Sequence, residues 1–261
     1  MRIDDLTRET FDDSITLCIG RKPGDENARE LKRRRLESTV PQHGGGKLAY
    51  ENGQVVGMAE YTSIEGSPFP IVGKDLLHLN CVWILPRFQK KGFGAELVKA
   101  CIHEAQRRGK KGISVLAYND PLFMPASFFQ HEGFYNVGTR GNEELLWKDL
   151  DHGSSRPPRF VTTPYVPETN PRKLFVNVFY CAQCPWSIKT QKRIEKISRE
   201  FPEAIVQSIK TDLRETLLQV GESKKVFVDG REVLLPTPTE DNIRTVLSQK
   251  IDERKLSLKE A

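Results

Sequence analysis

The sequence lacks an uninterrupted apolar stretch of the length that a membrane-spanning helix needs, about 20 residues. Its first residues, MRIDDLTRETFDD, carry acids where a secretory signal peptide has a basic start followed by an apolar stretch. We therefore expect a cytoplasmic protein with no membrane partner. Apolar residues make up 38% and charged residues 29%, which excludes wholesale disorder and indicates ordinary hydrophobic cores.

Cysteine is scarce. Of the five cysteines, three are scattered singly through hydrophobic stretches: Cys18, Cys81 and Cys101. Cysteines spaced in this way do not predict a disulfide framework. Only Cys181 and Cys184 form a local pair, and residues 153–261 add no histidine and no third cysteine. Because a structural zinc ion takes four ligands, we expect no metal site and interpret the pair as redox-capable thiols.

A large excess of charge of one sign is also missing. The formal net charge is +5 over 261 residues, and neither half shows the concentrated basic face of a nucleic-acid-binding protein. A dense basic run, LKRRRL at 31–36, is typical of the solvent-exposed side of a helix. We therefore expect no nucleic-acid partner.

Proline is concentrated in one place. Five prolines fall between Leu150 and Lys173: Pro157, Pro158, Pro164, Pro167 and Pro171. This density prevents helix continuation and central-strand pairing and favours an extended chain. The length suits two domains better than one, so we predict a domain at 1–150, a semi-rigid linker at 151–172 and a second domain at 173–261. Four linker side chains are suited to pack it onto one domain: Phe160, Val161, Tyr165 and Val166.

The first 150 residues mix two hydrophobic periodicities. Helical patterns fall at 12–19, 25–37, 93–108 and 125–131. Strand patterns fall at 47–51, 54–62, 76–85, 113–118, 134–139 and 143–149. The first two strands are joined by Asn52 and Gly53, which tolerate the positive φ angles of a tight hairpin. This order predicts an α+β fold with one mixed sheet.

The segment 82–97, VWILPRFQKKGFGAEL, is the most informative. A hydrophobic strand stops at Pro86, and a basic turn with two glycines opens the next helix. Backbone N–H groups at such a helix start bind anions, and Gly92 and Gly94 let a diphosphate approach closely, with Lys90 and Lys91 adding charge. A tight connection without a ligand is the alternative. The glycine patterns of the Rossmann and Walker motifs are not met.

The segment resembles the coenzyme-A motif of the GNAT N-acetyltransferase superfamily, Gln/Arg-x-x-Gly-x-Gly/Ala, which residues 89–94 match as Gln-Lys-Lys-Gly-Phe-Gly. The resemblance covers about residues 1–150. It includes the preceding strand and the long following helix. It also includes FFQHEGF at 128–134, which looks like the last helix of the family's domain, in which aromatic residues are followed by Gly-Phe.

The resemblance implies an enzyme that uses acetyl-coenzyme A to acetylate an amine of a small molecule or a protein. It implies that backbone groups of Ile84 and Leu85 hold the pantetheine arm and the acyl carbonyl. It assigns the pyrophosphate to Gln89, Lys90, Lys91, Gly92, Phe93, Gly94 and Ala95. Asn119, just past the next strand, is a further candidate for contact with the coenzyme's arm.

Attack of an amine on a thioester requires that the ammonium first lose a proton. His78 lies six residues before Ile84, where some members of the family place a general base, and imidazole titrates near neutral pH. Glu60 and Glu65, on the neighbouring strand and loop, are rival bases that would act through water. The alternative for His78 is a histidine that is only hydrogen-bonded within the sheet.

The sequence departs from the family at Phe129. Many members have a tyrosine at this position, four residues before the Gly-Phe pair, to protonate the leaving thiolate. A phenyl ring cannot donate a proton. Tyr118, Tyr135 or a water molecule would have to replace the tyrosine, unless the thiolate leaves without an acid.

The second part has a strand, a helix, a strand, a hairpin with an Asp-Gly turn and a last helix, at 173–180, 188–201, 204–210, 226–233 and from Thr239. This order is a thioredoxin-like pattern. A Cys-x-x-Cys between strand and helix should place the sulfur of Cys181 at the helix start, where the dipole lowers the thiol pKa. The segment 221–225, GESKK, lacks the proline that thioredoxins usually carry before the hairpin.

Together the two parts resemble the YoaP-like acetyltransferases. Three functions stay open: an acetyl-coenzyme-A-dependent transferase that the second domain positions or regulates, a thiol-disulfide oxidoreductase centred on Cys181 and Cys184, and a non-catalytic sensor of coenzyme and thiol state. The acceptor is not readable, because the residues that select it lie in the first helices and in loops such as 63–74. The oligomeric state, a homodimer included, is left open.

Overall fold

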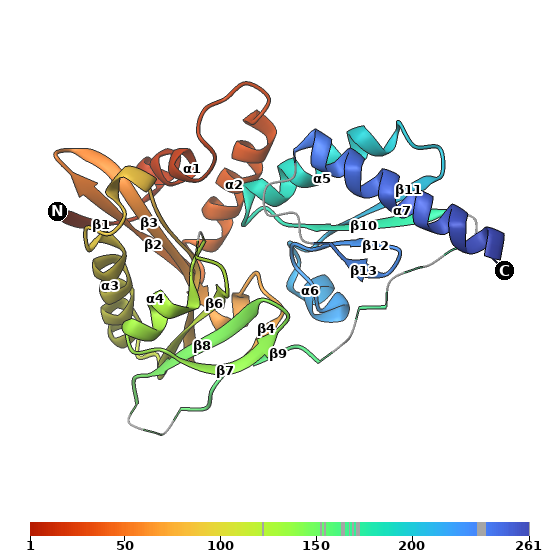
Figure 1. Cartoon of the computed structure of the whole chain (residues 1–261). Coiled ribbons are helices and arrows are strands. Elements are labelled where there is room, and N and C mark those ends of the chain that lie inside the picture. The colour runs from red at the N-terminus through yellow and green to blue at the C-terminus, as the bar shows by residue number, and fades with distance from the viewer. Residues whose placement is uncertain are drawn as a thin grey trace. The chain divides into compact units, whose positions relative to one another are not determined.

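The computed structural model describes residues 1–261 except 122, 152, 154, 163, 164, 167, 169, 171, 172, 234–238 and 261, and leaves the side chains of 256–260 undescribed. The chain divides into two compact units, Met1–Val161 and Thr162–Ala261 (Figure 1). Each unit has its own sheet and its own hydrophobic core.

The first unit is built around a seven-stranded sheet with the order β1-β2-β3-β5-β6-β8-β7. Its strands are β1 (Arg2–Asp5), β2 (Gly44–Glu51), β3 (Gln54–Ser63), β5 (Leu76–Ile84), β6 (Gly112–Tyr118), β7 (Tyr135–Arg140) and β8 (Glu143–Asp149). Neighbouring strands are antiparallel except β5 and β6, which are parallel. The predicted α+β fold with one mixed sheet is confirmed for this unit.

Helices cover both faces of this sheet, with α1 (Phe11–Ile19) and α2 (Glu26–Thr39) on one face and α3 (Phe93–Arg107) and α4 (Ala126–His131) on the other (Figure 1). Successive strand residues alternate between the faces. Accordingly, Ala59 and Tyr61 of β3 belong to the apolar core beneath α3, whereas Met58 and Glu60 accept hydrogen bonds from Ser14 of α1. The layer beneath α1 is therefore the more polar one.

The hairpin between β2 and β3 turns at the predicted place. Asn52 and Gly53 both have positive φ angles, 50° and 77°. This conformation suits the twist of a two-residue hairpin and is tolerated by asparagine and glycine.

Two short strands, β4 (Ile71–Val72) and β9 (Arg159–Phe160), form a separate antiparallel pair. The N–H of Val161 donates to the Pro70 carbonyl at 2.8 Å, and the Arg140 guanidinium lies 5.0 Å from the centroid of the Phe160 ring. Residues 159–161 thus belong to the first unit instead of forming a spacer, because Phe160 gains apolar contact there. Pro164, Pro167 and Pro171 lie outside the described residues.

The second unit has a four-stranded sheet with the order β11-β10-β12-β13. Its elements are β10 (Leu174–Tyr180), α5 (Pro185–Ser198), β11 (Ala204–Lys210), α6 (Arg214–Val220), β12 (Val226–Val228), β13 (Arg231–Glu232) and α7 (Glu240–Glu260). β10 and β11 are parallel, and the other pairs are antiparallel. All the predicted elements are present, and α6 is an addition.

One face of the second sheet packs on α5 and α7 through aliphatic side chains that include Val176, Ile194 and Ile243. The other face carries aromatic rings. Tyr165 lies 4.7 Å from Phe179 and 5.3 Å from Phe227, measured between ring centroids. The predicted linker therefore contributes Tyr165 to this unit.

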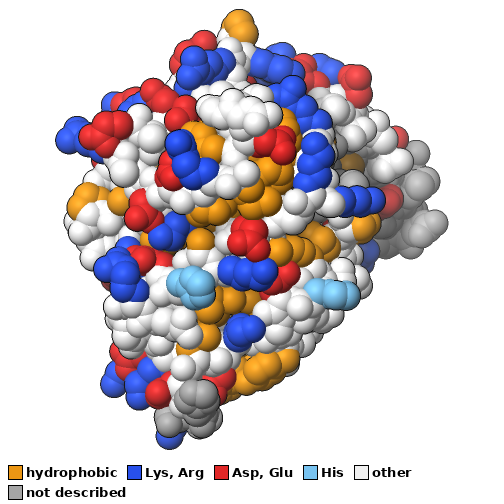
Figure 2. Space-filling model, turned by 90° about the vertical axis from the view of Figure 1, so that its left-hand side faces the viewer, with side chains coloured by type: hydrophobic (Ala, Val, Ile, Leu, Met, Phe, Trp, Pro, Cys, Tyr) orange, Lys and Arg blue, Asp and Glu red, His pale blue; other side chains and the backbone are white. Residues whose placement is uncertain are grey.

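The surface carries charges of both signs. On the face of the molecule that Figure 2 shows, Lys and Arg side chains are interspersed with Asp and Glu, and apolar side chains are exposed between them. Among the described residues, none of the helices is both long enough and apolar enough to cross a bilayer.

Candidate functional site

β5 and β6 separate in the middle of the first sheet. Their register pairs residues 76–79 with 112–115, and beyond these four pairs the two fully described strands are no longer neighbours. In the register of β3 with β5, Glu60 pairs with Cys81, and the next residue, Tyr61, pairs with Leu79. Asn80 of β5 is therefore the extra residue of a bulge. Because a bulge bends its strand, β5 turns away from β6. We call the resulting gap between the two strands the open edge.

Backbone groups of β5 line the open edge. The N–H of Leu85 donates to the Val56 carbonyl of β3 at 2.9 Å. Since successive strand residues direct their N–H and C=O groups to opposite sides, Ile84 and Val82 direct theirs away from β3. Leu85, a predicted coenzyme contact, thus has its N–H engaged inside the sheet. Val82, which the sequence interpretation did not name, has the same strand parity as Ile84.

The turn after β5 is closed by internal hydrogen bonds. Gln89 donates from Nε2 to the Ile84 carbonyl at 3.0 Å, and the N–H of Phe88 donates to the Leu85 carbonyl at 2.8 Å. The Lys91 ammonium lies 5.1 Å from the centroid of the Phe88 ring. Lys91 and its neighbour Lys90 are exposed. The turn is therefore fixed on its inner side and carries two cations on its outer side.

The two glycines of the turn have different roles. Gly92 is the N-cap of α3 with a φ of 85°, which disfavours any side chain. A Cβ atom on Gly94 would lie 3.2 Å from Cζ of Phe128. The first N–H groups of a helix lack intrahelical partners, so residues 93–95 form a cluster of donors beside the cations. The structure thus brings the predicted residues 89–95 together at a helix start suited to an anion.

Glu60 lies on the face of β3 that is turned away from α3. It forms a buried ion pair with Lys32 of α2 and accepts a hydrogen bond from Ser14 Oγ at 2.8 Å. The side chains of Lys32 and Glu60 are only 1% and 2% exposed. Lys32 belongs to the basic run that the sequence assigns to solvent. For this residue the prediction is wrong, because a buried carboxylate draws the ammonium inward.

Electrostatics keep Lys32 charged. Burial is the largest effect and would lower the pKa of Lys32, but the charges of Glu60, Cys18 and Cys81 and the hydrogen bond to Glu60 together outweigh it and raise the pKa above its ordinary value. Lys32 therefore remains an ammonium at neutral pH. It holds the Glu60 carboxylate in a fixed position.

His78 is fully buried in β5. Its Nδ1 lies 2.9 Å from Ser114 Oγ, and the Phe69 ring meets it edge to face at 5.3 Å. His78 pairs in register with Thr62, two residues from Glu60, so His78 and Glu60 lie on the same face of the sheet. The rival Glu65 is exposed and accepts a hydrogen bond from the N–H of Asp75 at 3.0 Å.

Phe129 is fully buried, and its ring centroid lies 4.9 Å from Phe128 and 5.9 Å from Phe134. It therefore packs as a core residue. Two tyrosines are candidates to act in its place as the proton donor to the leaving thiolate. Tyr118 is the last residue of β6, beside the open edge, and Tyr135 of β7 is 48% exposed.

Asn119 follows β6 directly and is exposed. Its N–H donates to the Asn142 carbonyl at 2.9 Å, which anchors the start of the loop after β6. Its side chain is therefore at the same end of the sheet as the open edge.

Cys181 and Cys184 are free thiols before α5. Cys184 is the N-cap of this helix, whereas Cys181 lies three residues earlier and is 1% exposed. Burial raises the pKa of Cys181, and the Cys184 sulfur adds to this effect, which the charge of Lys224 offsets only in part. The expected lowering of the Cys181 pKa is therefore wrong, because this sulfur is buried and does not lie at the helix start. No metal-binding group of three or more His, Cys, Asp or Glu occurs among the described residues.

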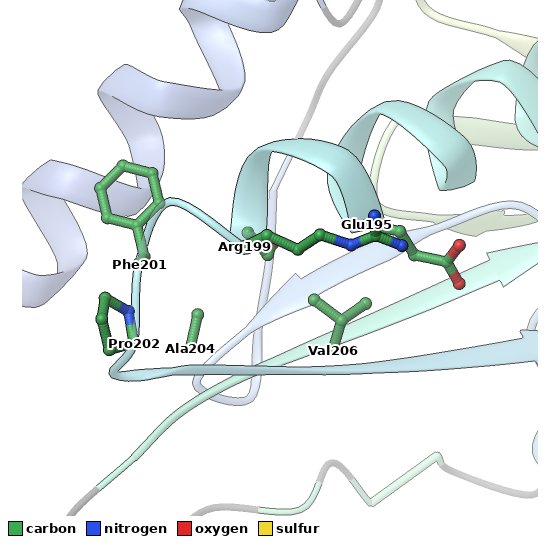
Figure 3. A pocket seen from close by; sticks show the side chains of 7 residues that line it. Glu195, Arg199, Phe201, Pro202, Ala204 and Val206 are labelled. Carbon is green, nitrogen blue, oxygen red and sulfur yellow. The ribbon is translucent and has the colours of Figure 1, made fainter.

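A cavity of about 550 Å³ lies at the other end of α5 (Figure 3). Its lining consists of Glu195, Ser198, Arg199, Phe201, Pro202, Ala204 and Val206. A helix of 14 residues is about 21 Å long, and Cys184 caps its start. The cavity is thus separate from the cysteine pair.

Comparisons with known proteins agree with the geometry of the first unit. Residues 8–134 match the model of the acetyltransferase (GNAT) family. The chain is also similar to "Uncharacterized N-acetyltransferase YoaP" of Bacillus subtilis (strain 168), with 23% identity over 234 residues, which cover 88% of this chain and 91% of that protein.

Two similar solved structures each cover a little over half of the chain. One is PaiA N-acetyltransferase from Thermoplasma acidophilum in complex with coenzyme A, with 14% identity, a TM-score of 0.44, and coverage of 57% of this chain and 100% of that one. Another is ribosomal-protein-alanine N-acetyltransferase from Brucella melitensis, with 19% identity, a TM-score of 0.43, and coverage of 57% and 100%.

The match to the family includes the open edge, the glycine turn and α4. Residues 8–134 are therefore a GNAT N-acetyltransferase domain.

Proposed function

We propose that the chain transfers the acetyl group of acetyl-coenzyme A to a primary amine of a small molecule or a protein. The observation that carries this proposal is the open edge, which ends in the glycine turn at the start of α3. An extended pantetheine arm in the open edge would meet the backbone groups of Val82 and Ile84. Its diphosphate would meet the N–H groups of residues 92–95 and the charges of Lys90 and Lys91.

The same geometry supports a proposal for the site of the acyl carbonyl. The N–H of Val82 points into the open edge two residues before that of Ile84, at the depth where the thioester would end. A backbone N–H aimed at the carbonyl oxygen stabilises the charge that develops when the amine attacks. We therefore assign the acyl carbonyl to Val82 and the arm to Ile84.

Two groups are candidates to receive the proton of the acceptor ammonium. Glu60 and His78 share the face of the sheet beneath α1, and both side chains are buried. Proton transfer to either therefore runs through water. The ion pair with Lys32 fixes the Glu60 carboxylate, and the bond to Ser114 fixes the His78 ring.

Protonation of the leaving thiolate cannot come from Phe129. We propose Tyr118 for this role, because it ends β6 where the strand borders the open edge. A Tyr118→Phe enzyme that is unchanged in kcat would mean that the thiolate leaves without an acid or takes its proton from water.

The first test is calorimetric titration of acetyl-coenzyme A into the reduced protein, followed by mass spectrometry of a panel of amines. Binding and an acetylated amine support the transferase. Failure of the unaltered protein to bind acetyl-coenzyme A contradicts it. The pH dependence of kcat/KM in Glu60→Gln and His78→Asn then identifies the base, since only loss of the true base removes the acid limb of the profile.

A second candidate function is thiol-disulfide chemistry in the second unit, which we propose to be thioredoxin-like. Two observations favour it: a parallel pair, β10 and β11, joined through α5 and followed by an antiparallel hairpin, and two free thiols before α5. Cys181→Ser separates the functions. A transferase that the second unit positions or regulates keeps acetyl transfer in reducing buffer, whereas an oxidoreductase loses its activity.

A further inference from the structure

The two cysteines of the second unit differ in accessibility. Cys181, the first in sequence, is 1% exposed, while Cys184 is partly exposed. A reagent or substrate in solution therefore meets the sulfur of Cys184 first. The sequence pattern predicted instead that the sulfur of Cys181 lies at the helix start.

Hydrogen bonds hold Cys181 in its buried position. Its N–H donates to Ser187 Oγ at 3.1 Å, and its carbonyl accepts the N–H of Cys184 at 3.2 Å. Between the cysteines, the N–H of Ala182 donates to Asp212 Oδ1 at 2.7 Å. The loop is thus fixed at both cysteines and between them, and Cys181 cannot reach the surface without breaking these bonds.

The two thiols also differ in their position relative to the start of α5. The effect of the helix dipole falls off within the first turn, and Cys184 caps α5 while Cys181 precedes it by three residues. Burial raises the pKa of Cys181. A thiolate is the nucleophile in disulfide exchange, so the two thiols are suited to different steps.

We propose that Cys184 is the attacking thiol and Cys181 the resolving thiol of a disulfide-reducing centre, a role that rests on the proposed thiol chemistry of the second unit. The Cys184 thiolate attacks one sulfur of a substrate disulfide, forms a mixed disulfide and releases the first thiolate. Cys181 then loses its proton to that thiolate and attacks the Cys184 sulfur, which releases the second thiolate. The substrate gains two electrons, and the cysteine pair becomes a disulfide.

The backbone permits this disulfide. The hydrogen bond from Cys184 N–H to the Cys181 carbonyl is that of a β-turn, which holds the two Cα atoms within about 7 Å. Disulfides span Cα separations of about 4.4–6.8 Å, so a small movement of Cys184 suffices. An external thiol such as dithiothreitol would return the pair to the reduced state.

The surroundings of Cys184 suit a disulfide with anionic ends. Trp186, two residues on, is 44% exposed, and the Lys189 ammonium lies 4.7 Å from the centroid of its ring. An apolar surface and a cation thus lie within the first turns of α5. Glutathione disulfide, which carries carboxylates, is therefore the probe that we choose.

The test uses the full chain. The reduced protein is pulsed with iodoacetamide, and peptide mass mapping follows each cysteine, with alkylation of Cys184 expected at least about ten times faster than that of Cys181 because only an accessible thiolate reacts. With glutathione disulfide, Cys181→Ser should accumulate an adduct on Cys184, because the resolving step is lost. Cys184→Ser should form none on Cys181.

The outcomes separate two failures. Faster alkylation of Cys181, or an adduct on Cys181 in Cys184→Ser, overturns the order of the thiols and leaves the redox function standing. No reaction of either cysteine with glutathione disulfide in the unaltered protein overturns the redox function itself. Near-ultraviolet circular dichroism of both serine variants verifies that the second unit stays folded.

Discussion

The side-chain amide of Gln89 donates a hydrogen bond to the main-chain carbonyl of Ile84 at 3.0 Å. This bond closes the turn on which the coenzyme would rest. Gln89→Met keeps the shape and removes the donor, at a cost of about 1 kcal/mol. We expect the Kd for acetyl-coenzyme A, measured by calorimetry, to rise about five-fold. Lys99→Met, an exposed change on α3, should leave the Kd unaltered, and equal values for both variants would contradict the role of Gln89.

Gly92 and Gly109 provide a matched pair. Both have positive φ angles, 85° and 65°, and a Cβ atom would meet nothing within 4 Å at either position. Each change to alanine should therefore lower stability by a similar amount, about 1–2 kcal/mol, through backbone strain. Only Gly92→Ala should also weaken acetyl-coenzyme A binding, since Gly109 follows the other end of α3. Heat unfolding and calorimetry together test this, and weakened binding in Gly109→Ala would refute it.

The buried pair of Lys32 and Glu60 should be costly to break. Lys32→Met leaves a buried carboxylate without its partner, which destabilises a fold by about 3–5 kcal/mol, whereas Lys32→Met combined with Glu60→Leu should recover most of this loss. Arg34→Met removes an exposed pair from the same basic run and should cost under about 1 kcal/mol. Urea unfolding measures all three. A Lys32→Met protein as stable as Arg34→Met would show that the pair is not buried.

The raised pKa of Lys32 sets the pH range of this contribution. The pKa of this lysine in the folded state exceeds its value of about 10.4 in the unfolded state. Such a lysine contributes its full stabilisation to the fold at every pH below the unfolded-state pKa. The contribution is lost as the pH rises through the folded-state pKa. The difference in stability between the unaltered protein and Lys32→Met should therefore be constant from pH 6 to pH 9. It should shrink only in more alkaline solution.

Glu104 governs stability at the acid end. Hydrogen bonds from Arg107, and then those from Arg108, outweigh burial and lower the pKa of Glu104 to about 2. A depressed carboxyl pKa stabilises the fold above the unfolded value of about 4.3, and this contribution is lost as the pH falls toward 2. We expect Glu104→Gln to be about 1–3 kcal/mol less stable at pH 6, with a smaller deficit at pH 3. A deficit that does not change with pH would show that the loss is one of packing.

Phe160 should stabilise the first unit although it lies in the predicted linker. Its ring packs on the core that includes Ile71 of β4 and Trp147 of β8, and Arg140 covers it. Phe160→Ala should lower the unfolding free energy by about 1–2 kcal/mol, less than the cost at a fully buried phenylalanine. Val166→Ala, at a site that is 78% exposed, should have no effect in the same thermal measurement. Equal melting temperatures of the two variants would indicate that β9 is not docked.

Local signals were enough to predict much of the fold. β5 ends at Ile84, close to the predicted position, because an apolar run meets Pro86, and the hairpin after β2 follows from Asn52 and Gly53. β1 was not predicted, because its four residues, RIDD, have no apolar pattern and are held only by pairing with β2. α6 was missed for a similar reason, since its seven residues bury one side chain, Leu217.

The candidate site likewise has a part that could be predicted from the sequence and a part that could not. The anion-binding turn is contiguous in sequence, so its residues could be named in advance. The partnership of Lys32 with Glu60 joins α2 to β3 across 28 residues, and no local pattern shows which lysine of a basic run faces a carboxylate. The order of exposure of Cys181 and Cys184 likewise depends on Ser187 and Asp212, which fix the loop through tertiary hydrogen bonds.

The open edge between β5 and β6 also bears on solubility. Unpaired strand edges are templates for pairing between molecules, and here two of them lie in the middle of a sheet. A bound coenzyme arm would occupy both edges, while a chain without coenzyme leaves them available to other chains. We therefore expect the coenzyme-free protein to aggregate at lower temperature than the loaded one, so that the cellular supply of coenzyme A would govern how much of this enzyme persists.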